Sequence, residues 1–312
     1  MSARVPHISV VIPTRGRPAS LERAIRSVFA QTGVDDVAVE LVVVDNHAGA
    51  EAKALGGRLA KGAPFPTAYV CEPTPGVASA RNAGVAKARA SLIAFIDDDE
   101  EASPGWLAAL MHAQARFEAD AVFGAVRGHA PETVRRHRAY FESFFSRLGP
   151  AEAGVIAGYY GCGDSLVRRA ALPDPVQPFD TAQNHMGGED DILFHAMQGQ
   201  GARFAWAPDA WVWEHPDPRR LTLAYALRRA FGYGQGPSYA CAARSPPDWK
   251  GAAYWMLVGL GQTLVYGAVA AAKWLSGSPD RAFALDRAAR GLGKVLWFRP
   301  FHLKLYGLPA DG

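Results

Sequence analysis

The chain has 312 residues, which is enough for one large domain or two small ones with a sizeable buried core. Hydrophobic residues make up 49% and charged residues 20%, which excludes a disordered or collagen-like chain. The net charge of +3 is too small to predict nucleic-acid binding, so we expect no nucleic-acid partner. A mildly basic surface suits an anionic small ligand or an anionic lipid.

Cysteine content and the N-terminal residues indicate the compartment. Cys71, Cys162 and Cys241 lie far apart and form no CxxC pair. We therefore expect neither a disulfide framework nor a structural zinc site, and we predict a reducing environment. No charged leader followed by a long apolar stretch is present at the start, so we expect no secretory signal and a cytoplasmic protein.

The first half of the chain alternates strand-like and helix-like patterns. Short apolar runs predict strands at residues 8–12, 39–44, 67–70 and 92–96, and helical spacing predicts helices at 20–29, 50–59, 78–88 and 104–117. This alternation is typical of an α/β fold with a mostly parallel central sheet and helices on both faces. Ligands of such folds bind at the carboxyl ends of the strands.

The second half is less regular. Its patterns predict strands at 121–126, 158–167, 204–206 and 211–213, and helices at 192–200, 221–233 and 282–296. No repeat or linker divides the chain before about residue 220. We predict one domain at 1–236, with halves 1–125 and 126–236, and a helical C-terminal region at 237–312.

One segment departs from the pattern of a soluble protein. Residues 251–272 carry no charge, and Lys250 and Lys273 flank them. Their length reaches that of a membrane span, but glycines together with Gln262 and Thr263 dilute the hydrophobicity. A membrane-spanning helix, a helix lying in the membrane interface and a buried helix of a soluble domain all remain open.

Polar side chains gather where three predicted strands end. Thr14 and Arg17 follow the first strand, Asp45 ends the second, and Asp97, Asp98 and Asp99 follow the fourth. Loops favour such residues in any case. Three consecutive carboxylates, however, repel one another unless a cation joins them. Mg²⁺ and Mn²⁺ prefer oxygen ligands and often take one or two from the protein and others from phosphates.

Five segments resemble a known family in their order and spacing. They read ISVVIPTRGRPASLERAIRSVFAQ, LVVVDN, GVASARNAG, IAFIDDDEEASPGWL and GGEDDILFHAMQGQGARFAWAPDAWVWEH. Over residues 7–236 they resemble family 2 glycosyltransferases, and in particular bacterial exopolysaccharide glucosyltransferases of the succinoglycan type. The resemblance implies a GT-A fold, a divalent metal (Mn²⁺ or Mg²⁺), a UDP-sugar donor and inversion at the sugar carbon. It also implies a saccharide acceptor linked to polyprenyl diphosphate, at the inner face of the cell membrane.

The resemblance also implies roles for individual residues. Asp45 accepts a hydrogen bond from the uracil imide, and alternation along an extended chain lets Asp97 face the ribose while Asp99 holds the metal. His215 is implied as a further metal ligand. Glu214 is its rival, and a site with neither residue is the remaining alternative. The implied donor-binding residues are Thr14, Arg17, Asp45, Arg81, Asp97 and Asp98. The basic pair Arg228 and Arg229 is implied to contact the diphosphate or an acceptor phosphate.

The implied general base is Asp190. An inverting transfer needs a carboxylate to take the proton of the attacking hydroxyl, and the diphosphate leaves with the metal rather than with a protonated oxygen. Asp190 is expected at a helix start, where the helix dipole favours the ionised form. Glu189 is expected to hold the acceptor, and Asp191 is the rival for the base.

Two other classes of function remain as alternatives. A sugar nucleotidyltransferase also uses paired aspartates on an α/β domain, but residues 13–17 are only faintly like its glycine-rich phosphate loop. A non-catalytic membrane-associated scaffold would explain residues 251–272 but leave the carboxylates without a role. A NAD-dependent enzyme needs a GxGxxG motif after the first strand, and the sequence has none there.

Overall fold

The computed structural model describes residues 7–184 and 187–301, and the chain forms two compact units. Residues 1–129 and 145–215 make the first unit, and residues 130–144 and 216–312 make the second. A domain boundary between residues 236 and 237 would fall inside a helix of the second unit, α7 (Leu223–Ala242), which continues past that point.

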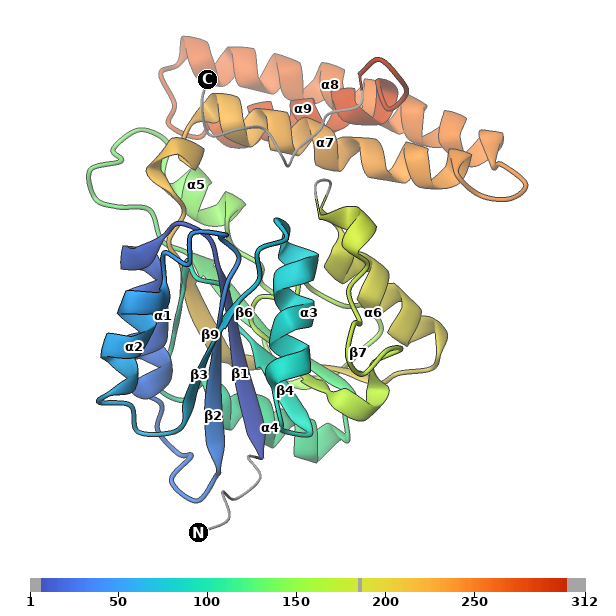
Figure 1. The fold of residues 1–312 in the computed structure, drawn as a ribbon. Coiled ribbons are helices and arrows are strands. Elements are labelled where there is room, and N and C mark those ends of the chain that lie inside the picture. Colours follow the sequence, from blue (N-terminus) through green and yellow to red (C-terminus); the bar gives the residue numbers. More distant parts are fainter. Residues whose placement is uncertain (1–6, 185–186, 302–312) are drawn as a thin grey trace. The chain divides into compact units, whose positions relative to one another are not determined.

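The first part of unit one alternates strands and helices as the sequence predicts. The elements are β1 (Ile8–Thr14), α1 (Pro18–Phe29), β2 (Val39–Asp45), α2 (Lys53–Ala60), β3 (Thr67–Cys71), α3 (Val77–Lys87) and β4 (Leu92–Phe95). The strands lie in the order β3-β2-β1-β4, and all these pairs are parallel. The carboxyl ends of the four strands therefore meet at one edge of the sheet (Figure 1).

The second part of the unit extends the same sheet with mixed strand directions. It contains β5 (Glu100–Ala102), α4 (Trp106–Phe117), β6 (Ala121–Gly128), β7 (Gly154–Ile156), β8 (Ser165–Arg168), α6 (Glu189–Gly199) and β9 (Phe204–Glu214). β8 runs antiparallel to β4 and β6, and β9 runs parallel to β6 but antiparallel to β5 and β7. All pairs among β3, β2, β1 and β4 are thus parallel, whereas the rest of the sheet combines antiparallel pairs with the parallel pair of β6 and β9.

Three of the predicted strands differ from the structure. The runs at 204–206 and 211–213 are one strand, β9, and its pairing with β6 shifts register after Gly124. The strand predicted at 158–167 is short, because only its end forms β8 and residues 161–164 form a loop. Pro208 therefore lies inside an irregular strand, β9, and the glycines at 161 and 163 lie in a loop.

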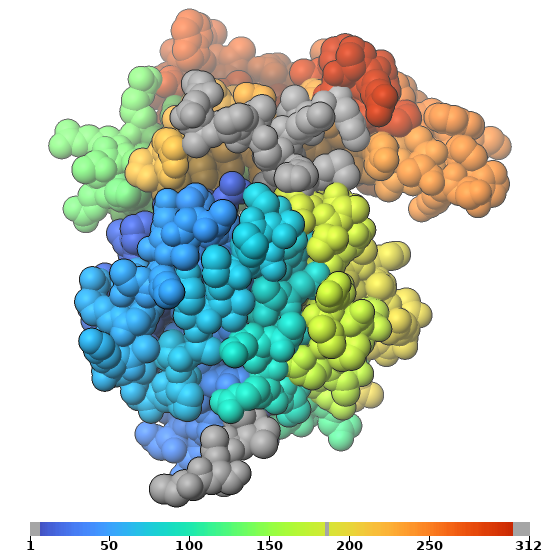
Figure 2. Space-filling model, viewed as in Figure 1, coloured from blue at the N-terminus to red at the C-terminus, as the bar shows by residue number. Residues whose placement is uncertain are grey.

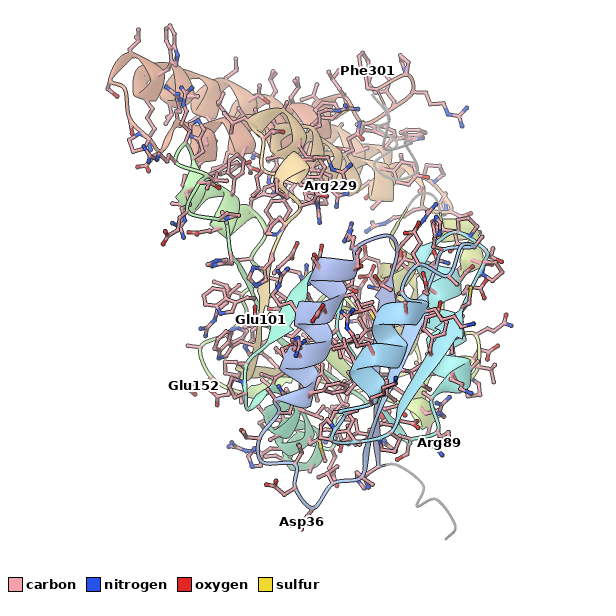
Figure 3. The ribbon with its side chains drawn as sticks, turned by 60° about the vertical axis from the view of Figure 1, so that its left-hand side comes forward. Asp36, Arg89, Glu101, Glu152, Arg229 and Phe301 are labelled. Atoms are coloured by element: carbon pink, nitrogen blue, oxygen red, sulfur yellow. The ribbon has the colours of Figure 1, made fainter. Side chains whose placement is uncertain are left out.

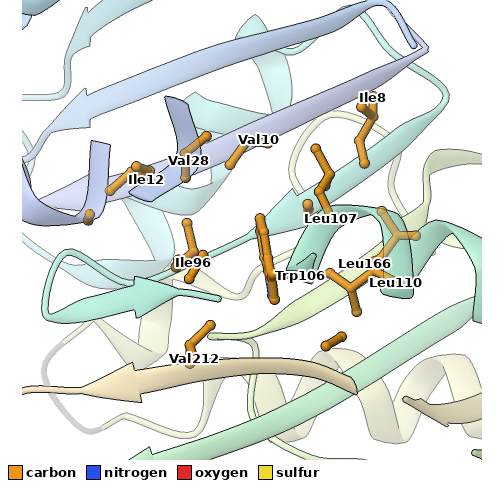
Figure 4. Close-up of a cluster of buried hydrophobic side chains, with 14 of the residues drawn as sticks. Ile8, Val10, Ile12, Val28, Ile96, Trp106, Leu107, Leu110, Leu166 and Val212 are labelled. Atoms are coloured by element: carbon orange, nitrogen blue, oxygen red, sulfur yellow. The ribbon is translucent and has the colours of Figure 1, made fainter. Parts of the chain in front are cut away.

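Two apolar clusters cover the two faces of the sheet. On one face Ile8, Val10 and Ile12 of β1 pack with α1, α2 and α4, and Trp106 is fully buried there (Figure 4). On the other face Val11 packs with α3 and α6. Alternate residues of a strand point to opposite faces, so one apolar run supplies both clusters. Burial of each large side chain stabilises the fold by about 1.5–3 kcal/mol.

The second unit is helical in the described residues. It contains α5 (Arg138–Phe144), α7, α8 (Trp249–Leu275) and α9 (Arg281–Val295). Helices α7 and α9 approach closely at glycines, because an added Cβ would lie 2.2 Å from the Arg290 carbonyl oxygen at Gly234 and 2.1 Å from that of Phe231 at Gly293. The predicted end of the helix at residue 233 is therefore wrong: the glycines that follow serve close packing, and the helix continues.

Helix α8 presents most of its apolar side chains to the surface of the unit. Leu257, Leu264 and Leu275 are 70%, 65% and 79% exposed, and Ala252, Gly259 and Ala270 are its buried residues. Among the described residues it is the one helix long and apolar enough to cross a membrane. A buried core helix, one of the three alternatives for this segment, is not what the structure shows.

Gly124 marks a position where β6 has no room for a side chain. A Cβ there would lie 1.9 Å from the Ala210 carbonyl oxygen and 2.3 Å from Asp164 Oδ1. We expect Gly124→Ala to destabilise the unit by at least about 1–3 kcal/mol, because backbone must move to admit the methyl group. Thermal unfolding of the purified protein measures this.

Gly57→Ala is the matched control for this prediction. Gly57 lies on α2 with no atom within 4 Å of an added Cβ. Alanine is the better helix former, so we expect a gain of about 0.5–1 kcal/mol. Equal unfolding temperatures for the two variants would contradict the close contact at Gly124.

Candidate functional site

The predicted polar residues meet at the carboxyl edge of the parallel strands. Thr14 and Asp45 are the last residues of β1 and β2 and lie side by side in the strand register. After β4 the chain turns, and the Glu100 N–H donates to the Asp97 carbonyl oxygen at 3.1 Å. The three strand ends therefore come together as the sequence predicts.

Asp98 lies at the centre of this edge. It accepts a hydrogen bond from Thr14 Oγ1 at 2.7 Å and another from Arg17 Nη1 at 3.0 Å. The same Arg17 nitrogen donates to Asp99 Oδ2 at 3.2 Å. Burial raises the pKa of Asp98 to about 6, although Arg17 opposes the shift. One guanidinium thus offsets part of the repulsion between adjacent carboxylates.

The expected alternation of the three aspartates is wrong. Residues 98 and 99 lie in a turn rather than in an extended strand. Asp98 and Asp99 consequently share Arg17, while Asp97 accepts from Arg81 Nη2 at 3.0 Å. A turn of this kind divides the carboxylates between two basic side chains.

Asp45 is fully buried, and one of its oxygens lacks a hydrogen-bond partner in the part of the chain that the structure describes. Its Oδ2 accepts from the Ala52 N–H at 2.7 Å and from the Tyr69 hydroxyl at 2.8 Å. Burial, together with this carboxylate, raises the pKa of Tyr69 well above its usual value. Asp45 Oδ1 has no hydrogen-bond partner among the described residues. Since buried polar atoms are normally paired, this oxygen is suited to receive an N–H of a ligand.

Arg81 joins the aspartate turn to the start of α6. Its side chain is 5% exposed, and it contacts Asp97 through Nη2 and Glu189 Oε1 through Nη1. Burial raises the pKa of Glu189, and Arg81 acts against that shift. Both terminal nitrogens of the predicted donor-binding Arg81 are therefore engaged by carboxylates. Glu189, the residue predicted to hold the acceptor, is itself buried and paired with Arg81.

A loop of small residues connects Asp97 with Asp190, and the sequence analysis missed it. The Cys162 N–H donates to Asp190 Oδ2 at 3.2 Å. A Cβ on Gly161 would lie 3.3 Å from the same oxygen, and one on Gly163 would lie 2.7 Å from Asp97 Oδ2. The Gly-Cys-Gly sequence was the available signal, because glycines permit backbone to approach ligands and side chains closely.

Helix α3 also contacts the segment that precedes α6, through Ser79 and Asn184. Asn184 accepts from the Ser79 N–H at 3.1 Å and donates to the Ser79 hydroxyl at 2.8 Å. Residues of these two segments lie against each other in the space-filling view (Figure 2). This contact fixes α3, which carries Arg81.

The two predicted metal ligands are neighbours across β5 and β9. The His215 N–H donates to the Asp99 carbonyl oxygen at 2.8 Å, next to the paired residues Glu100 and Glu214. His215 Nε2 lies 2.9 Å from Glu101 Oε2, a residue that the sequence analysis did not single out (Figure 3). Burial lowers the pKa of His215, which favours the neutral ring that binds metals.

These residues fit a divalent cation that is shared with a ligand. Among the described residues, no group of three or more His, Cys, Asp or Glu side chains is gathered to hold a metal ion. Mg²⁺ and Mn²⁺ in nucleotide sites need only one or two protein ligands, with phosphate oxygens and water supplying the rest. Asp99 and His215 supply two donor groups of this kind, and their role as metal ligands stays a prediction.

Glu214, the rival ligand, is directed elsewhere. Its Oε2 lies 3.5 Å from Arg147 Nη1, and Arg147 Nη2 donates to Glu100 Oε1 at 3.1 Å. Glu214 and Glu100 are 7% and 1% exposed. The structure therefore brings Arg147, another residue that the sequence analysis missed, to the two strands that adjoin the predicted metal ligands.

The remaining predicted contacts belong to the second unit. Arg228 and Arg229 lie on α7, where Arg228 is exposed and Arg229 is 9% exposed. Arg229 Nη2 donates to the Tyr233 hydroxyl at 2.7 Å, and its guanidinium lies over the Tyr233 ring (Figure 3). Their contact with a diphosphate stays a prediction.

Asp164 is a buried carboxyl behind the site. Trp106 Nε1 donates to its Oδ1 at 2.7 Å, and its Oδ2 has no partner among the described residues. Burial raises the pKa of Asp164 from 3.8 to about 7, although Trp106 and Arg147 oppose the shift. Folding therefore favours the protonated acid, and the stability of the folded state falls as pH rises between those two values.

We expect Asp164→Asn to remove this part of the pH dependence, because asparagine keeps the shape but cannot ionise. The stability of the variant relative to the unsubstituted protein should increase as pH rises from 5 to 8. Denaturant unfolding at several pH values measures the difference. A difference that stays constant over this range would contradict the raised pKa.

Comparisons with known proteins identify the family. The family model described as glycosyl transferase family 2 matches residues 9–174. The chain is 33% identical over 229 residues to the succinoglycan biosynthesis protein ExoM of Rhizobium meliloti, covering 73% of each chain. It is 29% identical over 251 residues to the pre-mycofactocin glycosyltransferase of Mycobacterium tuberculosis, covering 77% of this chain and 48% of that protein.

Solved structures share the fold at low sequence identity. S. aureus TarS superposes with a TM-score of 0.52 at 15% identity, over 73% of this chain and 40% of that one. GalNAc-T7 with UDP, GalNAc and Mn²⁺ superposes with a TM-score of 0.54 at 16% identity, over 76% of this chain and 51% of that one. The α/β fold of GT-A type is thereby confirmed. The chain belongs to family 2 of the glycosyltransferases.

Proposed function

We propose that this glycosyltransferase moves a hexose from a UDP-sugar to a saccharide acceptor, with inversion at the sugar carbon, in the synthesis of a bacterial exopolysaccharide. The hexose we propose is glucose. The similarity to ExoM, a succinoglycan biosynthesis protein, supports the pathway. One observation carries the reaction: the aspartate turn after β4 and the Asp190 end of α6 are joined by Arg81 and by the 161–163 loop.

The donor base is proposed to bind at Asp45. Its unpartnered Oδ1 accepts the imide N–H of uracil, a donor that cytosine lacks at that ring position. Thr14 is its neighbour in the strand register, and Arg17 reaches the same edge. Asp97 and Asp98 then face the ribose and the sugar from the turn.

Asp99 and His215 are the proposed ligands of a divalent cation, Mn²⁺ or Mg²⁺. A bound cation supplies a Lewis acid that stabilises the charge developing on the leaving diphosphate. Asp99 and His215 hold their positions through a backbone hydrogen bond between β5 and β9. Arg17, within 3.2 Å of Asp99, adds positive charge at the same place.

Asp190 is the proposed general base. It is the second residue of α6 and lies in the first turn of that helix, close to the loop at residues 161–163. The Cys162 N–H holds its Oδ2, and Glu189 beside it is fixed by Arg81. The carboxylate takes the proton of the acceptor hydroxyl as that oxygen attacks the sugar carbon. Glu189 is proposed to help shape the acceptor end of the site.

We expect Asp190→Asn to lower the transfer rate by about 10²–10⁴-fold, because the amide cannot accept the proton. UDP binding in the presence of Mn²⁺ should be unchanged, since Asp190 is not part of the donor edge. Transfer from UDP-glucose and UDP affinity by calorimetry measure the two effects. Asp191→Asn is the matched control, because Asp191 is the adjacent exposed acid on the same helix turn.

The outcome of this pair of variants separates the alternatives. Near-normal transfer in Asp190→Asn with a large loss in Asp191→Asn would move the base by one residue. Absence of UDP binding in the unsubstituted protein would favour the scaffold. A sugar nucleotidyltransferase, the other alternative, gains no support from the match to family 2.

The acceptor is proposed to be a lipid-linked saccharide at the inner face of the cell membrane. The exposed apolar side chains of α8 support membrane contact, and Lys250 and Lys273 lie at its two ends. A helix with an exposed apolar face and basic flanks binds the headgroup region of anionic bilayers. Such contact brings the enzyme to its polyprenyl-diphosphate-linked acceptor.

We expect the double substitution Leu257→Gln and Leu264→Gln to weaken co-sedimentation with anionic lipid vesicles several-fold, because each replaces an exposed apolar contact. Both side chains are at least 65% exposed, so folding should be unaffected. Leu148→Gln, an equally exposed leucine of the first unit, is the control. Equal sedimentation of all three proteins would contradict a membrane role for α8.

A further inference from the structure

Two buried glutamates face each other beside the proposed metal ligands. Glu100 of β5 and Glu214 of β9 are directly opposite in the antiparallel pair, and they are 1% and 7% exposed. Like charges directly opposite on neighbouring strands destabilise the pairing. A buried carboxylate also costs free energy unless a cation pairs with it.

Arg147 lies between these glutamates and contacts both. Its Nη2 donates to Glu100 Oε1 at 3.1 Å, and its Nη1 lies 3.5 Å from Glu214 Oε2. The planar guanidinium presents its nitrogens in a fixed fork, so one side chain can bind two carboxylates at a set separation. A lysine, with one ammonium group on a flexible stem, does not reproduce that geometry.

The backbone of Arg147 is itself anchored to the sheet. Its N–H donates to the Val126 carbonyl oxygen at 2.8 Å, and the Val126 N–H donates to its own carbonyl oxygen at 3.0 Å. Val126 is in β6, which pairs with β9. The guanidinium is therefore held against β5 and β9 from a fixed point.

The proposed metal ligands are the next residues along the same strands. Asp99 precedes Glu100, and His215 follows Glu214, with a 2.8 Å hydrogen bond from the His215 N–H to the Asp99 carbonyl oxygen. The distance between Asp99 and His215 therefore depends on how closely β5 and β9 are held together at the glutamate pair.

Arg147 also lies beside the loop that contacts the proposed base. A Cβ built on Gly161 would lie 3.6 Å from Arg147 Nε and 3.3 Å from Asp190 Oδ2. The loop whose Cys162 N–H donates to Asp190 therefore passes next to the guanidinium.

We propose that Arg147 is a positioning residue for the metal site: by binding Glu100 and Glu214 together, it sets the separation of Asp99 and His215. This rests on the proposed role of Asp99 and His215 as metal ligands. Arg147 touches neither the cation nor the substrates. It acts through the two glutamates, so its effect should depend on their charges.

The test measures Mn²⁺ binding, in the presence of UDP, by calorimetry or by the electron paramagnetic resonance of free Mn²⁺. We expect Arg147→Lys to raise the Mn²⁺ dissociation constant about 10–100-fold, the usual effect of losing a residue that orients metal ligands. Affinity for UDP without metal should change little. Arg168→Lys is the matched control, because Arg168 pairs with Asp120 at 3.0 Å and has similar exposure.

A second set of variants distinguishes positioning from a general loss of folding. In a Glu100→Gln and Glu214→Gln background the like charges are absent, so Arg147→Met should then change Mn²⁺ affinity by less than about threefold. Thermal unfolding of each variant shows that it is folded. A folded Arg147→Lys with unchanged Mn²⁺ affinity overturns the proposal, and so does an undiminished effect in the uncharged background.

Asp99→Asn separates this inference from the proposed function. It should abolish Mn²⁺ binding outright if Asp99 is a ligand. Unchanged binding in that variant would remove the proposed metal site, and the positioning role of Arg147 with it. Lost binding in Asp99→Asn with normal binding in Arg147→Lys would overturn the role of Arg147 alone.

Discussion

Pairing of buried carboxylates with arginines is the constraint on which this site depends. Arg17 holds Asp98 and Asp99, and Arg81 holds Asp97. A buried carboxylate without a cationic partner would be protonated, or its charge would destabilise the folded state. With the arginines in place, acidic groups can gather at one edge of a sheet whose core is apolar. The site is therefore an arrangement of ion pairs supported by two hydrophobic clusters.

The same constraint joins elements that are distant in the chain. Arg81 of α3 contacts both the turn after β4 and the start of α6. Gly161 and Gly163 let a loop pass between that turn and Asp190 without a side chain in the way. The proposed donor edge, built from parallel strands, is thus fixed against the proposed base, Asp190, which comes about 90 residues later in the sequence. An inverting transfer needs this fixed spacing, because the hydroxyl must lose its proton as it attacks.

The second unit differs from the first in how its apolar side chains are placed. Its helices pack through glycines and leave apolar side chains of α8 exposed, whereas the first unit buries the apolar strands β1, β2 and β4. Exposed apolar surface of this extent marks an interaction site in a folded protein. The structure gives the proposed membrane contact a defined face, with Leu257 and Leu264 among its residues.

The sequence by itself determined the alternating elements, the carboxyl edge with Thr14, Asp45 and the aspartates, and the helix start at Asp190. Those follow from local rules, because periodicity and strand ends are written in neighbouring residues. The turn at residues 97–100, the 161–164 loop and the role of Arg147 needed the tertiary structure. Contacts between residues far apart in the sequence decide which arginine pairs with which buried carboxylate. The residues around Arg147 in the sequence do not indicate that its partners are Glu100 and Glu214.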